Sequence, residues 1–392
     1  MPQGAYTPIF EIWKGGENYT ANFNNRTVQI QVDLVSGGGG GDTCQITVDD
    51  RDWLISTPQV GDGLEIYLGY AEVGLARTGV FQTDRVTFTG PPKGITIHGT
   101  GASFAGSIKS HVVKNFDGKS LGDIVKGLLE GTGYSANIDE SLSSLKIPYL
   151  NVNQSPIAAI ENLSRQYGGI FKVNDKQVTI GKRDGNTTAS GEAMSTYVLN
   201  PSHFAEWSVE HLNRHQYDKV TATYKDADWN TTKFESAGTS SSGFLTANGE
   251  SAGGDKVFNI RGWFQNKELA QAAAKAKMAE LDDMLGQGQF RLAQGDPWIR
   301  DSQRLILTGF RTGINGAYTT DVVRHTFTKD GGLSTSIVTK PPNTGDTGSS
   351  SDIQGAVTVP DGSVIGTTLP TTMPSSLPDG TPAAQGQYGP GA

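Results

Sequence analysis

The sequence predicts a mainly β protein of the α+β class, in which two similar β-domains flank a small α/β module. One strand-turn-strand pattern occurs on both sides of a helix-bearing middle segment, and the composition is rich in Gly, Ser and Thr. A third observation is a C-terminal segment whose composition departs from that of the rest of the chain. We therefore expect four parts, at residues 1–110, 111–183, 184–340 and 341–392.

The repeated pattern is Gly-x-aromatic-x-Thr-Asp-x-Val, found at Gly79–Val86 and again at Gly316–Val323. Each copy follows an apolar run that ends in Gly-aromatic, at Leu64–Tyr70 and at Arg304–Phe310. Two runs of strand-forming residues joined by a Gly-bearing loop are typical of a β-hairpin. After each copy, a Gly-rich turn leads into another alternating strand. The pattern favours duplication of a three-stranded unit over chance similarity between unrelated hairpins.

The composition limits the classes of function. The chain has 392 residues and a net charge of -8, from 32 Lys and Arg against 40 Asp and Glu. This balance argues against nucleic-acid binding, which needs a Lys- and Arg-rich face to neutralise phosphates. The single cysteine, Cys44, excludes an intrachain disulfide and suits a reducing compartment. No apolar run is long enough to cross a bilayer and the N-terminus lacks a secretory signal, so we expect a soluble protein.

Residues 1–110 contain short alternating runs that predict strands. In Thr27–Leu34 the apolar positions should share one buried face. These positions are Val28, Ile30, Val32 and Leu34. Five glycines, Gly37–Gly41, separate this strand from the next one at Thr43–Val48. A phosphate-binding loop is the alternative for these glycines, but no Gly-Lys-Ser/Thr follows and the next element is a strand, so a strand-connecting loop is favoured.

Residues 111–183 should form the α/β module. Ser120 can cap a helix that has Asp123 at its third position and ends at Gly131. A second amphipathic helix begins at Ser155, has Pro156 in its first turn and stops at Gly168–Gly169. A β-hairpin follows it directly. Neither helix presents a histidine or a carboxylate pair on one face, so we interpret the module as a spacer or docking element.

Residues 184–340 should form the second β-domain, interrupted by a Ser-, Gly- and Thr-rich stretch at residues 236–254. The longest predicted helix, Asn266–Leu285, precedes the second copy of the repeated hairpin. Its expected inner positions are Leu269, Ala273, Ala276, Leu281 and Met284.

Residues 341–392 hold eight of the 17 prolines and contain no Phe, Trp, Lys or Arg. Such a segment buries too little apolar area to offset its ordering entropy, so we expect it to be disordered unless it binds a partner. Two apolar pieces, Ala356–Val359 and Ser363–Leu369, could pair with an open sheet edge of a partner. The candidate partner-binding residues are Val357, Val359, Val364, Ile365 and Leu369. The alternative is an inert tail.

No group of residues supports catalysis, a cofactor or a metal ion. His211 and His215 have i, i+4 spacing, but they lack the Glu of a zincin and lie in a segment with strand character. The acidic clusters Asp49–Asp52, Asp226–Asp228 and Asp282–Asp283 lie at expected turns or at a helix end, where solvated carboxylates are ordinary. No Gly-x-Ser-x-Gly elbow is present, and no spacing singles out the facing carboxylates of a glycosidase.

The order β-domain, α/β module, β-domain resembles the late control D family of tail hub proteins of contractile phages. It is also similar to the N-terminal hub part of the VgrG proteins of type VI secretion. The resemblance covers most of residues 5–340 and depends on the order and spacing of Gly118–Val125, Gln154–Gly169 and Gly295–Phe310. It implies two tube-like β-barrels per chain and a homotrimer. Six similar barrels around one axis would adapt a six-fold tail tube to a three-fold central spike.

The resemblance therefore implies a structural baseplate hub of a contractile phage tail or phage-like injection particle. Its implied partners are two further copies, the tail tube or tube-initiator protein, the central spike and other baseplate wedge proteins. Its implied location is the virion tail baseplate, with assembly in the host cytoplasm.

The sequence departs from VgrG because no spike domain follows the second barrel, which makes residues 341–392 the candidate for reaching a separate spike. Two other functions remain as alternatives, a tail-associated peptidoglycan-degrading enzyme and a carbohydrate-binding tail module.

Overall fold

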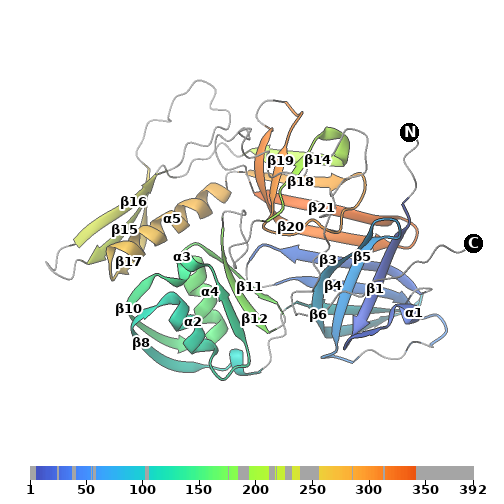
Figure 1. Ribbon diagram of the computed structural model, residues 1–392, viewed down its shortest axis with the longest axis horizontal. Coiled ribbons are helices and arrows are strands. Elements are labelled where there is room, and N and C mark those ends of the chain that lie inside the picture. Colours follow the sequence, from blue (N-terminus) through green and yellow to red (C-terminus); the bar gives the residue numbers. More distant parts are fainter. Residues whose placement is uncertain are drawn as a thin grey trace, which may run out of the picture.

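The computed structural model describes residues 6–23, 26–37, 41–53, 55, 59–101, 106–174, 176–183, 194–211, 217, 219–225, 232–238, 256–284, 286–311 and 314–340. Most of the strands belong to one 13-stranded sheet. Figure 1 shows this sheet as two stacked β-domains, with helices and smaller sheets beside them. The predicted fold class, α+β and mainly β, is confirmed.

The first β-domain contains the N-terminal strands and one short helix. They are β1 (Pro8–Lys14), β2 (Glu17–Asn18), α1 (Thr20–Phe23), β3 (Thr27–Val35), β4 (Thr43–Asp49), β5 (Gly63–Tyr70), β6 (Gly74–Thr89) and β7 (Gly94–Thr100). The alternation in β3 directs Ile30, Val32 and Leu34 into the core, and Ile46 of β4 lies opposite Ile30. The strands pair in the order β3-β4-β7-β6-β5-β1-β2.

Val28 does not share the buried face of β3. Its side chain is 49% exposed, whereas the preceding Thr27 is buried. The pairing of β3 with β4 changes register between Thr27 and Gln29, as at a β-bulge, so the inward-outward alternation changes phase before Ile30. The prediction that Val28 is buried is therefore wrong.

The second β-domain contains the last strands of the described chain. They are β13 (Tyr197–Leu199), β14 (Phe204–His211), β18 (Gly286–Leu292), β19 (Arg304–Leu307), β20 (Gly316–Thr328) and β21 (Gly332–Lys340), with the short 3₁₀ helix η2 (Pro201–His203) before β14. Phe290, Leu305 and Tyr318 are among the side chains that this domain adds to the core of the first domain. One hydrophobic core therefore serves both β-domains.

The two β-domains repeat one strand order. The order β3-β4-β7-β6-β5 in the first corresponds to β14-β18-β21-β20-β19 in the second. The repeated sequence motif lies in β6 and in β20, at the same place in each sheet. Val86 lies opposite Ile97 in one copy, and Val323 lies opposite Ile337 in the other. The predicted duplication of a three-stranded unit is confirmed, and it extends to five strands.

The α/β module follows the first β-domain. Its elements are η1 (Gly106–Ile108), β8 (Val112–Ser120), α2 (Leu121–Leu129), β9 (Ser135–Ile138), α3 (Glu140–Ser143), β10 (Lys146–Gln154), α4 (Pro156–Gln166), β11 (Gly169–Asn174) and β12 (Gln177–Lys182). The backbone N–H of Asp123 donates to the Ser120 hydroxyl at 3.1 Å, which caps α2 as predicted. Ile124 and Leu128 of α2 face the module core.

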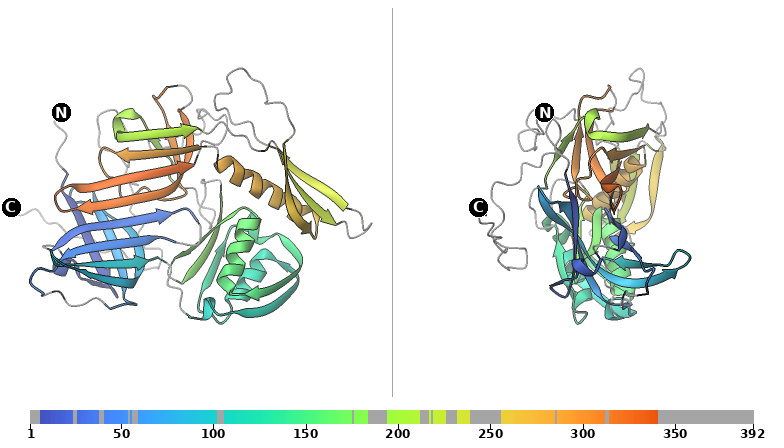
Figure 2. Two further views of the ribbon diagram at one scale, coloured as in Figure 1. Left: turned by 180° about the vertical axis from the view of Figure 1, so that it is seen from behind. Right: turned by 90° about the vertical axis from the view of Figure 1, so that its right-hand side faces the viewer.

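A further sheet and the longest helix lie between β14 and β18 in the chain. They are β15 (Lys219–Lys225), β16 (Thr232–Gly238), β17 (Val257–Phe264) and α5 (Lys267–Asp283). Leu269 and Ala273 of α5 and Val220 of β15 belong to the same hydrophobic core as the α/β module, and Figure 2 shows these elements next to it. Met284, expected to face inward, is 60% exposed because α5 ends one residue before it.

Replacing Ile306 should destabilise the fold far more than replacing Val28. Ile306 is 2% exposed in β19, so Ile306→Ala leaves a cavity and should cost about 2–5 kcal/mol of unfolding free energy. Val28→Ala removes an exposed side chain and should stay within about 0.5 kcal/mol of the wild type. Urea denaturation of the two variants measures the difference. Equal losses of unfolding free energy in the two variants would contradict the outward orientation of Val28 at the bulge in β3.

Candidate assembly interface

The two β-domains are joined by direct backbone pairing between β20 and β3. Val323 lies opposite Leu34, His325 opposite Val32 and Phe327 opposite Ile30. All six side chains are at least nine-tenths buried. Figures 1 and 2 show the two strands side by side where the domains meet.

The length of β20 makes this junction possible. Its first residues pair with β19, and its residues 322–328 pair with β3 on that same edge, while β21 occupies the other edge. β20 therefore extends beyond its own domain and offers the free half of one edge to the neighbouring domain.

A bidentate ion pair lies on the outer face of this junction. The Nε of Arg324 donates to Oδ1 of Asp33 at 2.7 Å, and its Nη2 donates to Oδ2 at 3.1 Å. The hydrogen bonds to Asp33 raise the pKa of Arg324. Because the Arg324 side chain is 53% exposed, solvent screens the pair, and its main effect is to fix the register of the two strands.

His325 lies on the inner face of the junction and is fully buried. Its Nε2 donates to the Ile299 carbonyl at 3.0 Å, so its Nδ1 is the acceptor toward the Thr335 hydroxyl, also at 3.0 Å. Burial lowers the pKa of His325 to about 3, and the nearby Arg300 adds to this effect. The imidazole is therefore neutral at physiological pH.

The loop after β18 contributes a second buried titratable group, Asp296. Its Oδ1 accepts a hydrogen bond from the Trp298 backbone at 2.9 Å, whereas its Oδ2 has no hydrogen-bond partner among the described residues. Burial raises the pKa of Asp296 to about 6. The same loop binds the first β-domain, because the Tyr70 hydroxyl donates to the Gly295 carbonyl at 2.8 Å.

A buried ionic contact joins the α/β module to both β-domains. Lys172 of β11 lies 3.0 Å from Oδ1 of Asp42 and 2.7 Å from Oδ1 of Asp301. Burial alone would lower the pKa of Lys172, but the two carboxylates outweigh it and raise the pKa. Beside it, Arg300 donates to the carbonyl oxygens of Thr78, at 2.6 Å, and of Arg77. Three parts of the chain therefore meet at one charged cluster.

Two other strand edges are open within the described part of the chain. Residues 85–89 of β6 pair only with β7. By contrast, residues 322–328 of β20 pair with β21 on one edge and with β3 on the other. β14 pairs only with β18. Both edges carry large exposed side chains, since Phe88 is 54% and Trp207 is 42% exposed. Open edges with exposed apolar side chains are typical sites of association with another chain.

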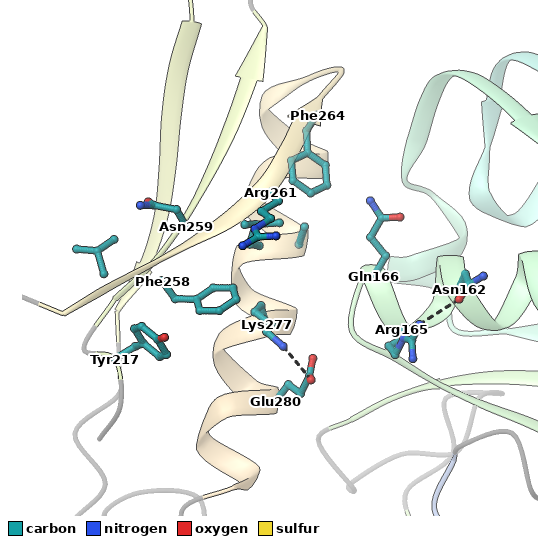
Figure 3. A pocket seen from close by; sticks show the side chains of 13 residues that line it. Asn162, Arg165, Gln166, Tyr217, Phe258, Asn259, Arg261, Phe264, Lys277 and Glu280 are labelled. Atoms are coloured by element: carbon teal, nitrogen blue, oxygen red, sulfur yellow. Dashed lines mark hydrogen bonds and ion pairs between the residues drawn. The ribbon is translucent and has the colours of Figure 1, made fainter. Parts of the chain in front are cut away.

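A separate cleft of about 840 Å³ lies between α4 and the α5–β17 unit. Figure 3 shows Arg165 and Asn162 of α4 on one side, and Lys277 and Glu280 of α5 on the other. Lys277 pairs with Glu280 at 2.9 Å, and Arg165 donates to Asn162 at 3.1 Å. Arg261 adds a third basic group to the lining. Three basic groups and one carboxylate therefore line the cleft. Sequence reasoning missed this cleft because its residues come from distant parts of the chain.

The partner-binding residues predicted in the tail lie outside the described residues. They are Val357, Val359, Val364, Ile365 and Leu369. The His211 side chain and His215 are also outside the described part. Among the described residues, no three His, Cys, Asp or Glu side chains group as metal ligands would, and no helix combines the length and apolar character of a membrane span.

Sequence comparison identifies relatives among tailed phages. No family model matches the chain. A probable baseplate hub protein of Escherichia phage P2 is 26% identical over 219 residues, which are 56% of this chain and 56% of the relative. The probable baseplate hub protein of Escherichia phage 186 is 23% identical over 218 residues, with 55% and 56% coverage. This chain is similar to phage baseplate hub proteins. It spans little more than half the length of these curated relatives.

Solved structures share the fold of this chain at lower sequence identity. A tail protein from Neisseria meningitidis has a TM-score of 0.60 at 12% identity, covering 86% of this chain and 97% of the other. The 43 kDa tail protein of prophage MuSo2 from Shewanella oneidensis has a TM-score of 0.61 at 12% identity, covering 86% and 99%. The resemblance to tail hub proteins predicted from the sequence is confirmed.

The stability of the protein should depend on pH through His325. Its pKa is about 3 in the folded protein and 6.5 when unperturbed, so the unfolded chain binds the proton first and stability falls as the pH drops below 6.5. At about pH 5 this loss should reach about 2 kcal/mol relative to neutral pH. The variant His325→Gln should lack this component, although it is less stable at neutral pH.

Chemical denaturation of both proteins at several pH values isolates the effect. Asp296, whose raised pKa acts in the opposite direction, is present in both proteins and cancels in the comparison. Parallel pH profiles for wild type and variant would contradict a neutral buried His325.

Proposed function

We propose that this protein is the structural baseplate hub of a contractile phage tail or phage-like injection particle. In this role it acts as a homotrimer that adapts a six-fold tail tube to a three-fold central spike. The observation that carries the proposal is the β20–β3 junction, which merges two copies of one β-unit into a continuous sheet. The similarity to baseplate hub proteins of two phages supports the same conclusion.

The physical argument concerns symmetry. Two similar units joined edge to edge in one chain are related by a rotation and a shift, and repeating that operation generates either a ring or a filament. Three chains with two units each make a ring of six, which matches a six-fold tube on one side. The differences between the two units reduce the true symmetry to three-fold, which matches a trimeric spike on the other side.

A structural role is also supported by the placement of His325 and Asp296, two titratable groups with shifted pKa values. His325 and Asp296 are buried in packing contacts between strands and a loop, and neither lines the cleft between α4 and α5. Catalytic acids and bases need access to a substrate, which these positions lack. Contacts with the tail tube, the spike and wedge proteins belong to the same proposal.

Native mass spectrometry of the purified protein tests the trimer. The expected species has three times the 41.6 kDa mass of one chain. Electron microscopy of the same sample should show rings with a pseudo-six-fold outline. A sample that stays monomeric at every concentration tested, or that forms dimers only, would contradict the trimeric hub. Release of muropeptides from purified peptidoglycan would instead favour the enzymatic alternative.

We also propose that residues 341–392 bind a separate spike protein, for which the apolar pieces Ala356–Val359 and Ser363–Leu369 are the candidates. Deleting these residues should leave a species with three times the mass of the truncated chain in native mass spectrometry. In a pull-down assay, the deletion should weaken capture of the spike protein of the same particle. The double variant Val364→Asp with Ile365→Asp should act in the same direction, because charges disfavour strand addition to an apolar edge. Unchanged spike capture by both variants would contradict this proposal.

A further inference from the structure

The shared strand order relates paired positions of one β-domain to paired positions of the other. Val86 and Val323 occupy the same place in the repeated motif, and each starts a ladder that crosses the sheet. The ladder in the first domain runs Val86, Ile97, Ile46, Ile30. The ladder in the second runs Val323, Ile337, Phe290, Trp207. Trp207 in β14 is therefore the counterpart of Ile30 in β3, and Val209 is the counterpart of Val32.

This correspondence shows that, within the described residues, the open edges of β6 and β14 lack the partner strand that β20 and β3 provide for each other. Within the chain, the second half of β20 is covered by β3. Its counterpart, residues 85–89 of β6, has no strand on the same edge among the described residues, and β14, the counterpart of β3, has none on its outer edge. One chain therefore contains one formed junction and the two separate halves of a second one.

We infer that β6 of one copy pairs antiparallel with β14 of the next copy, so that Phe88 lies opposite Val209. The same register places Gly90, the first residue of the turn after β6, opposite Trp207. This inference rests on the proposed trimeric hub and identifies the contact that closes it. The register follows from the formed junction, in which His325 lies opposite Val32 and Phe327 opposite Ile30. It makes a head-to-tail interface, which closes into a ring when the rotation divides a full turn.

Burial supports the assignment. His325 and Phe327 in β20 are 0% and 8% exposed, whereas Phe88, the counterpart of His325, is 54% exposed. In the same way Ile30 is 0% exposed and its counterpart Trp207 is 42% exposed. Large apolar side chains thus remain in contact with solvent at the positions that β3 and β20 cover for each other. A second copy would cover both of them.

Side-chain size is complementary across the inferred contact. In the formed junction an aromatic residue of β20, Phe327, faces the smaller Ile30 of β3. In the inferred junction the large residue comes from the other strand: Trp207 of β14 is the larger side chain, and Gly90 leaves space opposite it. On the outer face, Glu210 would lie opposite Thr87 and diagonal to Arg85, within reach of an ion pair that resembles Arg324–Asp33.

Cysteine cross-linking tests the register directly. In a Cys44→Ala background, the double variant Phe88→Cys with Val209→Cys is treated with an oxidant or a short bismaleimide and separated on a denaturing gel. We expect a covalent trimer, because each chain would be linked to both neighbours. The matched control Thr87→Cys with Val209→Cys places the two thiols on opposite faces of the sheet and should give no trimer.

The outcomes separate this inference from the proposed function. A trimer by native mass that gives no cross-linked trimer at residues 88 and 209, or that cross-links equally in the control pair, overturns the β6–β14 pairing and leaves the hub proposal standing. A monomer by native mass without cross-links overturns both.

Surface variants give an independent readout. Phe88→Glu should abolish the trimer peak in native mass spectrometry without changing the melting temperature of the separated chains, since the side chain is exposed in one chain. Tyr149→Glu, at a 50% exposed aromatic residue in the α/β module, should leave the trimer intact. Retention of the full trimer peak by Phe88→Glu would refute the inference.

Discussion

Backbone pairing between β20 and β3 is the contact on which the rest of the architecture depends. It fixes the two β-domains relative to each other by a ladder of hydrogen bonds rather than by a flexible linker. A slip of one residue between the strands would turn either His325 or Val32 out of the core, so burial of both residues specifies the register. The bonds of His325 to Ile299 and Thr335 then tie the ladder to the loop behind it.

The α/β module is positioned by a different kind of contact. Lys172 reaches Asp42 of one β-domain and Asp301 of the other, which makes one ammonium group the common point of three parts of the chain. A buried ion pair adds little net stability, because desolvation offsets most of its attraction, but removing one member leaves an uncompensated charge. The arrangement therefore selects one geometry of the three parts over others more than it strengthens the fold.

The two copies of the β-unit have diverged at the positions where their use differs. In β20 the second half of the strand carries His325 and Phe327, which are buried inside the chain. The corresponding half of β6 carries the exposed Phe88 and ends at Thr89. One edge geometry can thus serve an intramolecular contact in one copy and remain available in the other. Duplication followed by divergence explains why the backbone topology is shared while the side chains are not.

The sequence by itself determined the strands of both β-units, the capped helix after Ser120 and the duplication, because these depend on local periodicity, turn residues and caps. Only the tertiary structure decided that a bulge turns Val28 outward, that α5 packs on the α/β module, and that Lys172 meets Asp42 and Asp301. It also decided which edge of β20 receives β3. These features arise from contacts between residues far apart in the chain, and strand periodicity shows which face of a strand is buried but not which strand will occupy its edge.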